Sequence, residues 1–179
     1  DRDTMMSTID SIKYYNSLLH AGFITLDPFT GYVKTYVGGV NFDAFKFDHV
    51  SQSKRQPGST FKAFVYTAAL ENGWGPCDKM NDVPVTYKYV EKGVNKTWSP
   101  QNAEYSFSGS SVTLKYAFAK SINSIAVQLT QQMGWQKVIE YAHKLGIKSK
   151  LADVPSVCLG SSDVSLFELI TAYCPLIND

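Results

Sequence analysis

The sequence predicts a mixed α and β domain, on the evidence of two kinds of hydrophobic pattern. Residues 21–39, "AGFITLDPFTGYVKTYVGG", alternate polar and apolar side chains on both sides of a Pro-Phe-Thr-Gly turn, which is typical of a β-hairpin. Later segments carry apolar residues at helical spacing, the first of them directly after Ser59. With 179 residues and 44% hydrophobic composition, the chain is long enough to bury the core of one domain.

Composition and charge exclude several classes of protein. The formal net charge is +1 and the only tight basic cluster is Lys54-Arg55, so nucleic acid is not an expected partner, because phosphate binding needs clustered cations. No stretch approaches the roughly 20 apolar residues of a membrane span, and the first residues lack the features of a signal peptide. An opening Asp instead of Met favours a piece of a longer, anchored protein.

The first half of the chain is expected to contain a helix, a hairpin, a loop and a second helix. Apolar residues at helical spacing predict a helix over 8–19, and the hairpin follows at 22–38. Residues 41–57 show no clean period and are expected to form an irregular loop. After Pro57-Gly58 the spacing predicts a helix with a buried apolar stripe, formed by Phe61, Phe64, Val65 and Ala68.

The second half is expected to be mostly helical after one irregular segment. Residues 73–109 are rich in Pro, Asn and Gly, with one strand-like run, "VPVTYKYV", at 83–90. A long helix is predicted from Val112 to Gly134, capped by Ser110 or Ser111. Shorter amphipathic helices are predicted over 135–145 and 165–176.

Ser59 and Lys62 form a Ser-x-x-Lys motif where the loop becomes a helix. Residues i and i+3 share a helix face, so the Lys62 amine can reach Ser59 Oγ, and a serine in the first turn also offers a free backbone N–H. Lys62 can act as a base only if its pKa falls from about 10.4 to about 7–8. The alternative is a helix cap beside a surface lysine. A second match, Ser51 and Lys54, lies in the irregular loop and is interpreted as chance.

Ser121 and Asn123 interrupt an apolar segment, "AFAKSINSIAVQL", inside the long predicted helix. Two polar groups in a core-facing segment cost free energy unless they are paired. A catalytic cleft would pair them, with Ser121 relaying a proton near Lys62 and Asn123 holding a substrate amide or Lys62 itself. The alternative is a helix kink or a polar exit from the core.

No metal or cofactor site is expected. Cys77, Cys158 and Cys174 lack metal-ligand spacing and are expected to be separate, mostly buried thiols. The three histidines are scattered along the chain: His20, His49 and His143.

Four segments of the sequence carry motifs in a distinctive order and spacing: "FITLDPFTGYVKTYVGG", "RQPGSTFKAFVYTAALENG", "WSPQNAEYSFSGSSVTLKYAFAKSINSIAVQL" and "LGSSDVSLFELITAY". Together they resemble the transpeptidase domain of class A penicillin-binding proteins. The resemblance begins near Gly22 and implies a penicillin-binding protein/β-lactamase-like fold, an α/β (α+β) arrangement in which an antiparallel sheet, incomplete on its C-terminal side, packs with helices. Residues 1–20 would form a linker helix, and residues 21–179 the N-terminal part of the domain.

The resemblance implies a serine acyltransferase that cross-links peptidoglycan stem peptides on the extracytoplasmic face of the bacterial membrane and is acylated by β-lactams. By position, Ser59 is the acylated nucleophile, Lys62 its base, and Ser121 and Asn123 the second motif. The segment leading into that motif would shape the substrate-binding wall of the cleft, with Trp98, Pro100, Asn102 and Gly109. A membrane anchor and a glycosyltransferase domain would lie upstream.

One departure from the family pattern concerns the third motif. Lys-Thr/Ser-Gly should follow the second motif far downstream, and no such tripeptide occurs in this sequence. With it would go the carboxylate-binding residues, the second oxyanion N–H and the strands that complete the sheet. The sequence is therefore expected to be a fragment, which by itself acylates slowly or is an inert structural or binding piece.

Two other enzyme classes are alternatives. A β-lactamase or β-lactam sensor shares Ser-x-x-Lys and the fold, but rapid deacylation needs a carboxylate on a loop, and "LADVPSVCLGSSDV" matches the penicillin-binding pattern instead. A Ser-His-Asp hydrolase would need a Gly-x-Ser-x-Gly elbow, which the sequence lacks, and no motif places any of the histidines.

Overall fold

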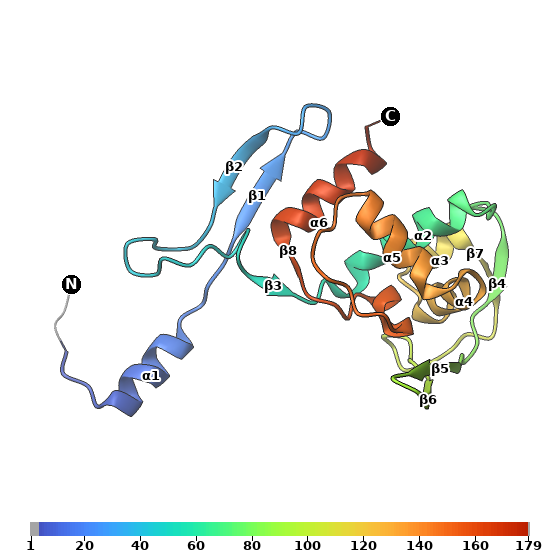
Figure 1. Ribbon diagram of the computed structural model, residues 1–179, viewed down its shortest axis with the longest axis horizontal. Coiled ribbons are helices and arrows are strands. Elements are labelled where there is room, and N and C mark those ends of the chain that lie inside the picture. The colour runs from blue at the N-terminus through green and yellow to red at the C-terminus, as the bar shows by residue number, and fades with distance from the viewer. Residues whose placement is uncertain (1–3, 179) are drawn as a thin grey trace.

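The computed structural model describes residues 4–178 and shows a helical body with a hairpin and an initial helix beside it (Figure 1). The hairpin consists of β1 (Phe23–Leu26) and β2 (Val33–Val37). Residues 1–3 of the predicted linker helix and Asp179 lie outside the described residues. The fold therefore separates an outlying N-terminal part from a body built around the helix that follows Ser59.

The initial helix, α1 (Thr8–Ser17), begins where predicted but buries little. Ser7 caps it, accepting a hydrogen bond from the Asp10 backbone N–H at 3.2 Å. Its expected apolar face is exposed, since Ile9 is 65% and Ile12 is 56% accessible. Its cap and its internal hydrogen bonds, and not packing against a core, therefore stabilise α1. None of the described helices, α1 included, has both the length and the apolar character needed to cross a bilayer.

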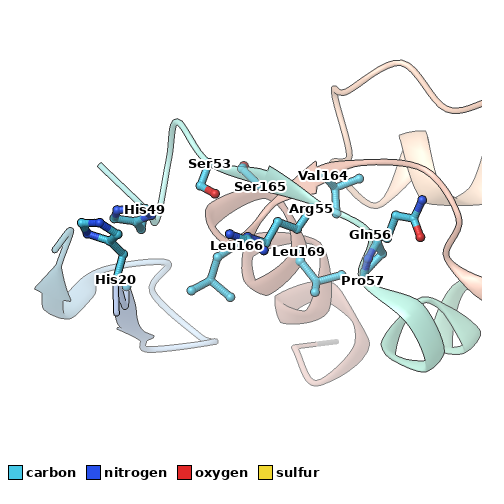
Figure 2. A pocket seen from close by; sticks show the side chains of 11 residues that line it. His20, His49, Ser53, Arg55, Gln56, Pro57, Val164, Ser165, Leu166 and Leu169 are labelled. Carbon is cyan, nitrogen blue, oxygen red and sulfur yellow. The ribbon is translucent and has the colours of Figure 1, made fainter. Parts of the chain in front are cut away.

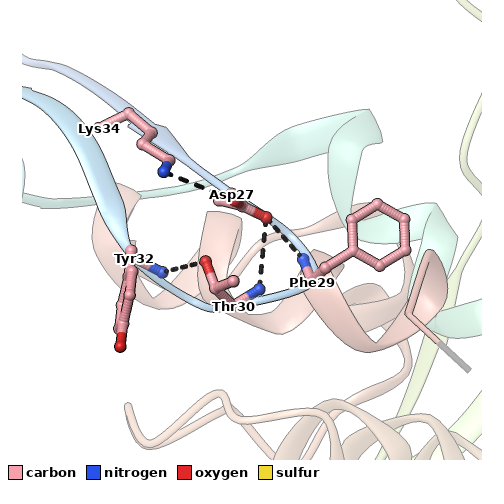
Figure 3. A network of polar contacts seen from close by, with 5 residues as sticks. All are labelled: Asp27, Phe29, Thr30, Tyr32 and Lys34. Atoms are coloured by element: carbon pink, nitrogen blue, oxygen red, sulfur yellow. Dashed lines mark hydrogen bonds and ion pairs between the residues drawn. The ribbon is translucent and has the colours of Figure 1, made fainter.

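The predicted hairpin is confirmed, because β1 and β2 pair antiparallel. Asp27 organises its turn (Figure 3), where Oδ1 accepts the backbone N–H groups of Phe29 at 3.0 Å and Thr30 at 3.3 Å. These hydrogen bonds, led by the one from Phe29, hold the pKa of Asp27 below its usual value. Gly31 has a φ of 70°, a left-handed conformation that a side chain would strain.

Ring stacking and backbone contacts join the hairpin to the helical body. His20, which precedes β1, stacks on His49, and their ring centroids are 5.0 Å apart. The Phe167 backbone N–H, on α6 (Leu166–Tyr173), donates to the Val50 carbonyl at 3.0 Å. A hollow opens between these segments, with His20 and His49 at one end and side chains of α6 along one side (Figure 2).

The helix α2 (Lys62–Glu71) is the centre of the core. It packs against α4 (Asn123–Met133) and α5 (Trp135–Lys144), the latter close to the predicted 135–145. The four residues of the predicted stripe are all fully buried: Phe61, Phe64, Val65 and Ala68. Because α2 is surrounded by protein on most sides, it forms a rigid support for the residues at its N-terminus.

In the described part of the chain the strands form four separate two-stranded antiparallel sheets, not the single sheet that the resemblance implies. Beyond the first hairpin, the pairs are β3 (Lys54–Arg55) with β8 (Val164–Ser165), β4 (Lys79–Asn81) with β7 (Ser111–Thr113), and β5 (Tyr87–Glu91) with β6 (Val94–Trp98). The β4–β7 pair matters for the candidate site, because it brings Asp82, the residue after β4, beside the segment 102–108 that leads to the second motif.

The strand-like run predicted at 83–90 is only partly a strand. β5 begins at Tyr87 and turns back into β6, which makes a hairpin that the sequence pattern does not reveal. Lys92 and Gly93 form its turn, both left-handed at φ 51° and 78°. A two-residue turn of this kind favours Asn or Asp before Gly, and a lysine in the first position conceals it.

The long helix predicted over 112–134 is broken into α3 (Leu114–Ala119) and α4. Between them, Ser121 has a φ of 55°, which a continuing right-handed helix cannot contain. The placement of Ser121 inside a helix is therefore wrong, because the helix is interrupted at this residue. Ser121 lies at the break, and Asn123 is the first residue of α4.

Two predicted helix termini and one expectation about the thiols are also corrected. Thr113 caps α3, so neither Ser110 nor Ser111 does. The last helix ends at Tyr173, because a proline two residues later cannot continue it and a 3-10 turn follows. Among the described residues the cysteines are free thiols, and Cys77 is exposed rather than buried.

Candidate active site

Ser59 lies in a 3-10 turn, Gly58–Phe61, immediately before α2. The predicted first α-helical turn is thus a tighter turn, and α2 itself begins at Lys62. The Lys62 backbone N–H donates to the Ser59 carbonyl, so the turn continues directly into the helix. The Ser59 side chain is exposed, whereas Lys62 is 1% exposed. A candidate nucleophile at the surface therefore lies next to a buried amine.

A second segment packs against the turn that carries Ser59. Gly160 follows a 3-10 turn, Pro155–Leu159, and its carbonyl accepts the Gly58 N–H at 3.2 Å. Gly160 has a φ of 71°, and a Cβ there would lie 2.2 Å from the Gly58 carbonyl oxygen. Only glycine fits at this position. The close approach fixes the backbone immediately before Ser59.

The Lys62 Nζ atom lies within hydrogen-bond distance of four oxygens of the described residues. The distances are 2.6 Å to the Ser121 carbonyl, 2.9 Å to Ser121 Oγ, 2.6 Å to Asn123 Oδ1 and 3.3 Å to Ser59 Oγ. An ammonium has three N–H donors, so it cannot serve four acceptors at once, and the contact with Ser59 is the weakest. Burial lowers the pKa of Lys62 to about 8.

Ser121 reaches Lys62 because of its backbone conformation. A residue continuing α3 would direct its carbonyl along the helix axis, whereas the left-handed Ser121 directs both its carbonyl and its hydroxyl at Lys62. A non-glycine residue in this conformation carries strain of about 1–2 kcal/mol, and such strain concentrates at functional sites. The break between α3 and α4 is therefore part of the site.

Asn123 is the first residue of α4, and both ends of its side chain are held. Nδ2 donates to the Gln101 carbonyl at 2.7 Å, and Oδ1 accepts from Lys62. The backbone N–H groups of Asn123 and Ser124 donate to Asn102 Oδ1, at 3.0 and 3.1 Å. The residue before α4 cannot cap the helix, because it is an isoleucine. Asn102 therefore caps α4 from the preceding segment.

Comparison with known proteins identifies the family of the chain. A sequence model described as the penicillin binding protein transpeptidase domain matches residues 21–178. The chain belongs to this family. Penicillin-binding protein 1A of Rickettsia prowazekii (strain Madrid E) is 36% identical over 160 residues, which are 89% of this chain and 20% of that protein. The Pseudomonas aeruginosa protein of the same name is 34% identical over 159 residues, 88% of this chain and 19% of that protein. The chain spans about a fifth of the length of these relatives.

Solved structures confirm the predicted fold class for this transpeptidase domain. Penicillin-binding protein 1A from Haemophilus influenzae superposes with a TM-score of 0.78 at 28% identity, covering 87% of this chain and 23% of that one. Penicillin-binding protein PonA1 from Mycobacterium tuberculosis gives a TM-score of 0.71 at 25% identity, covering 93% of this chain and 45% of that one. The resemblance drawn from the motifs is therefore correct.

In this transpeptidase domain a shallow hollow lies beside Ser59 and Lys62, between α2, α3 and the C-terminal turn. Its other lining residues are mostly apolar: Thr60, Ala63, Phe118, Ser121, Tyr173, Leu176 and Ile177. The Tyr173 hydroxyl donates to the Thr60 carbonyl, which ties α6 to the turn that carries Ser59. Among the described residues, this hollow and the one in Figure 2 share no lining residue.

The contacts of Trp98, Asn102 and Gly109 are with the protein, and none of the three is among the described residues that line the hollow. Trp98, on β6, packs against the core. Asn102 caps α4, and the Gly109 N–H donates to the Asp82 carbonyl at 2.9 Å. Of the three, Asn102 contacts the second motif directly, and a contact of any of them with substrate stays a prediction.

Sequence reasoning missed the groups that hold the two motifs in place. Gln101 acts through its carbonyl, and a backbone group has no signature in the sequence. Asp82 lies in a segment that shows no periodic pattern, so a single acidic residue there does not stand out. Gly160 belongs to the quoted "LGSS" motif, but only the fold reveals that it contacts Gly58.

Proposed function

We propose that this chain carries the serine acylation machinery of a peptidoglycan DD-transpeptidase, with Ser59 acylated by stem peptides and by β-lactams. The observation that carries the proposal is the buried Lys62 amine, 3.3 Å from Ser59 Oγ and with its pKa lowered to about 8. A lysine with an ordinary pKa is protonated at neutral pH and cannot accept a proton from serine. Membership in the transpeptidase family supports the same chemistry.

The contacts of Lys62 suit a neutral amine that acts as a base. The Ser121 carbonyl and Asn123 Oδ1 can only accept hydrogen bonds, and each lies 2.6 Å from Nζ. Two N–H groups of a neutral amine satisfy them. The lone pair is then left for a hydroxyl, either that of Ser59 or that of Ser121. The arrangement therefore directs the basic lone pair toward the candidate nucleophile and its neighbour.

The proposed reaction transfers an acyl group in two steps. Ser59 Oγ forms a bond to the carbonyl carbon of the D-Ala-D-Ala peptide bond while its proton passes to Lys62 Nζ. The C–N bond then breaks, and Ser121 relays a proton from Lys62 to the leaving amine. The amine of a second stem peptide then forms a bond to the ester carbonyl carbon and gives up a proton to Lys62. The C–O bond to Ser59 breaks, and the proton passes from Lys62 to Ser59 Oγ, which completes the cross-link. The Ser59 backbone N–H supplies one oxyanion donor.

A β-lactamase is the less favoured interpretation of the same motifs. Rapid deacylation by the commonest serine type needs a carboxylate that activates water beside the ester. Within residues 4–178 no Asp or Glu lines the hollow next to Ser59, and the loop acid Asp153 is tied to Trp135 Nε1 at 2.6 Å. The proposal therefore includes slow release of a bound penicillin.

We also infer the place of this chain in its parent protein. Residues 1–20 would be a linker helix and residues 21–179 the N-terminal part of the transpeptidase domain, an assignment supported by a family match that begins at residue 21. Relatives named penicillin-binding protein 1A support a bacterial cell-wall enzyme that works on the extracytoplasmic face of the membrane. The parent would carry its anchor and a glycosyltransferase domain upstream.

Labelling with a fluorescent penicillin tests the proposal. We expect slow covalent labelling that maps to Ser59 by mass spectrometry and is abolished in Ser59→Ala. The labelling rate should rise with pH through about 8, because Lys62 is an ammonium below that value and a free amine above it. Lys62→Ala should remove this pH dependence together with most of the rate.

The second Ser-x-x-Lys provides a matched control. Ser51 Oγ donates to Asp48 Oδ2 at 2.6 Å, so Ser51 is engaged elsewhere. Ser51→Ala should label at the rate of the unchanged chain. Labelling that survives Ser59→Ala, or that depends on Ser51, would contradict the proposed function.

A further inference from the structure

Asp82, the residue after β4, is a buried carboxylate at the junction of three segments. It is 4% exposed, and no described Lys, Arg or His forms an ion pair with it. Oδ1 accepts from Asn102 Nδ2 at 2.8 Å and from Ser124 Oγ at 2.6 Å. Oδ2 accepts from the Ser108 backbone N–H and hydroxyl, both at 2.9 Å. Four neutral donors thus satisfy one buried charge.

These hydrogen bonds keep Asp82 ionised in the folded protein. Burial is the largest single influence and raises the pKa of the carboxyl, but the donors of Ser108, Ser124 and Asn102 together lower it below its usual value. The site therefore requires a carboxylate, because both of its oxygens can accept hydrogen bonds. A neutral amide of the same shape has only one acceptor oxygen, and its NH2 group would face donors.

Asp82 determines which way the Asn102 side chain faces. Its carboxylate and the Ser106 carbonyl both accept from Asn102 Nδ2, the latter at 3.0 Å. The amide oxygen of Asn102 is consequently turned to α4, where it accepts the N–H groups of Asn123 and Ser124. A reversed amide would place its NH2 group against the two N–H donors of α4 and its oxygen against the acceptors of Asp82 and Ser106.

The first turn of α4 is thus held twice by the same carboxylate. One connection runs from Asp82 through Asn102 to the backbone of Asn123, and the other runs directly to the Ser124 hydroxyl. Asn123 then presents Oδ1 to Lys62, and the strained Ser121 lies just before it. We propose that Asp82 is a positioning residue, which holds the start of α4 so that Ser121 and Asn123 enclose the Lys62 amine.

The catalytic meaning of this inference rests on the proposed function, but the placement of Lys62 can be tested without catalysis. If the start of α4 loosens, water reaches the amine, and the burial that lowers the pKa of Lys62 is relieved. Among the described residues, the other titratable group that acts on Lys62 is the Cys158 thiol. Burial raises the pKa of that thiol to about 12, so it stays neutral during the titration.

The experiment is an NMR titration of the Lys62 side chain in the present chain and in its variants. The unchanged chain should titrate near pH 8, and Asp82→Asn should move the midpoint upward, toward the ordinary value of 10.5. Val138→Ala, a fully buried change on α5, controls for general loss of stability and should leave the midpoint in place. A midpoint that does not rise in Asp82→Asn, or that rises equally in Val138→Ala, would overturn the proposal.

Two serine variants keep the test valid if Asp82→Asn does not fold. Ser124→Ala and Ser108→Ala each remove one hydroxyl hydrogen bond to Asp82, but only Ser124 belongs to α4. Ser124→Ala should raise the Lys62 midpoint more than Ser108→Ala does, and equal or reversed effects would refute the role of Asp82. Failure of the unchanged chain to label at Ser59 would instead contradict the proposed function and leave these titrations unaffected.

Discussion

Replacing Gly160 with alanine should displace Ser59, although the two residues are far apart in sequence. An added Cβ would lie 2.2 Å from the Gly58 carbonyl oxygen and 2.6 Å from the Gly58 nitrogen. Both are backbone atoms, so no flexible side chain can move aside. Because Gly58 directly precedes Ser59, relief of the overlap must shift the nucleophile or the loop that holds it.

Gly31 is a matched control that separates this overlap from backbone strain. Its φ of 70° equals that of Gly160 at 71° within a degree, but nothing lies within 4 Å of the position that an alanine methyl group would take there. Both substitutions carry the left-handed cost of about 1–2 kcal/mol, offset by about 0.4–1 kcal/mol from the less flexible unfolded chain. Gly160→Ala adds overpacking of about 1–3 kcal/mol. At about 2–4 °C per kcal/mol for a chain of this size, it should lower Tm by about 2–12 °C more than Gly31→Ala does.

Thermal unfolding followed by circular dichroism measures the difference in stability, and fluorescent penicillin measures the effect on Ser59. At a temperature where both variants are folded, Gly160→Ala should label about 10–100 times more slowly than Gly31→Ala, because a displacement of about 1 Å at a reacting group has a cost of this order. Equal Tm values for the two variants, or an undiminished labelling rate in folded Gly160→Ala, would refute the reasoning.

Two further substitutions test strain and pH dependence. Ser121→Gly and Ser121→Ala both lose the hydroxyl that contacts Lys62, so both should label slowly. In urea unfolding the glycine variant should be more stable than the alanine variant by about 1 kcal/mol, because a φ of 55° strains alanine but not glycine. Equal stabilities of the two variants would argue against strain at this residue. Burial acts most strongly on Glu168 and raises its pKa, but hydrogen bonds from Ser149 and Ser165 outweigh it and lower the pKa to about 2. The ionised Glu168 therefore stabilises the folded protein fully above its ordinary pKa of 4.5, and this contribution is lost as pH falls through about 2. At pH 6, Glu168→Gln should be less stable than the unchanged chain by about 1–2 kcal/mol, and this difference in stability should narrow in acid. A gap that is independent of pH would contradict this assignment.

The parts of the fold that the sequence predicts well are those determined by neighbouring residues. The hairpin at 22–38 follows from alternation and a turn, and the stripe of α2 follows from helical spacing. The break at Ser121 could not be predicted this way, because contacts with Lys62 on another helix stabilise a conformation that local preference opposes. The single sheet was expected from the family resemblance, whereas the described residues pair only in twos.

In the candidate site, too, the residues related by local sequence spacing could be predicted, and those that act through distant contacts could not. Ser59 and Lys62 could be predicted as a pair because they are three positions apart, and this spacing alone brings them together in a helical turn. Ser121 and Asn123 could be associated with them because two polar residues interrupt an apolar segment, an observation that the family motifs support. Asp82 and Gly160 could not be found in either way, because each acts by contacting a segment distant in sequence.

The spacing of Ser59 and Lys62 is necessary for the proposed chemistry but cannot produce it. In an isolated helix the same two residues would face water, and Lys62 would keep its ordinary pKa of 10.5. The pKa of about 8 arises because the break at Ser121 and the first residue of α4 close over the buried amine. The acceptors that orient the amine depend in turn on the buried carboxylate of Asp82. The basicity of Lys62 is therefore a property of the assembled core, and substitutions that loosen α4 should alter it even where they touch neither Ser59 nor Lys62.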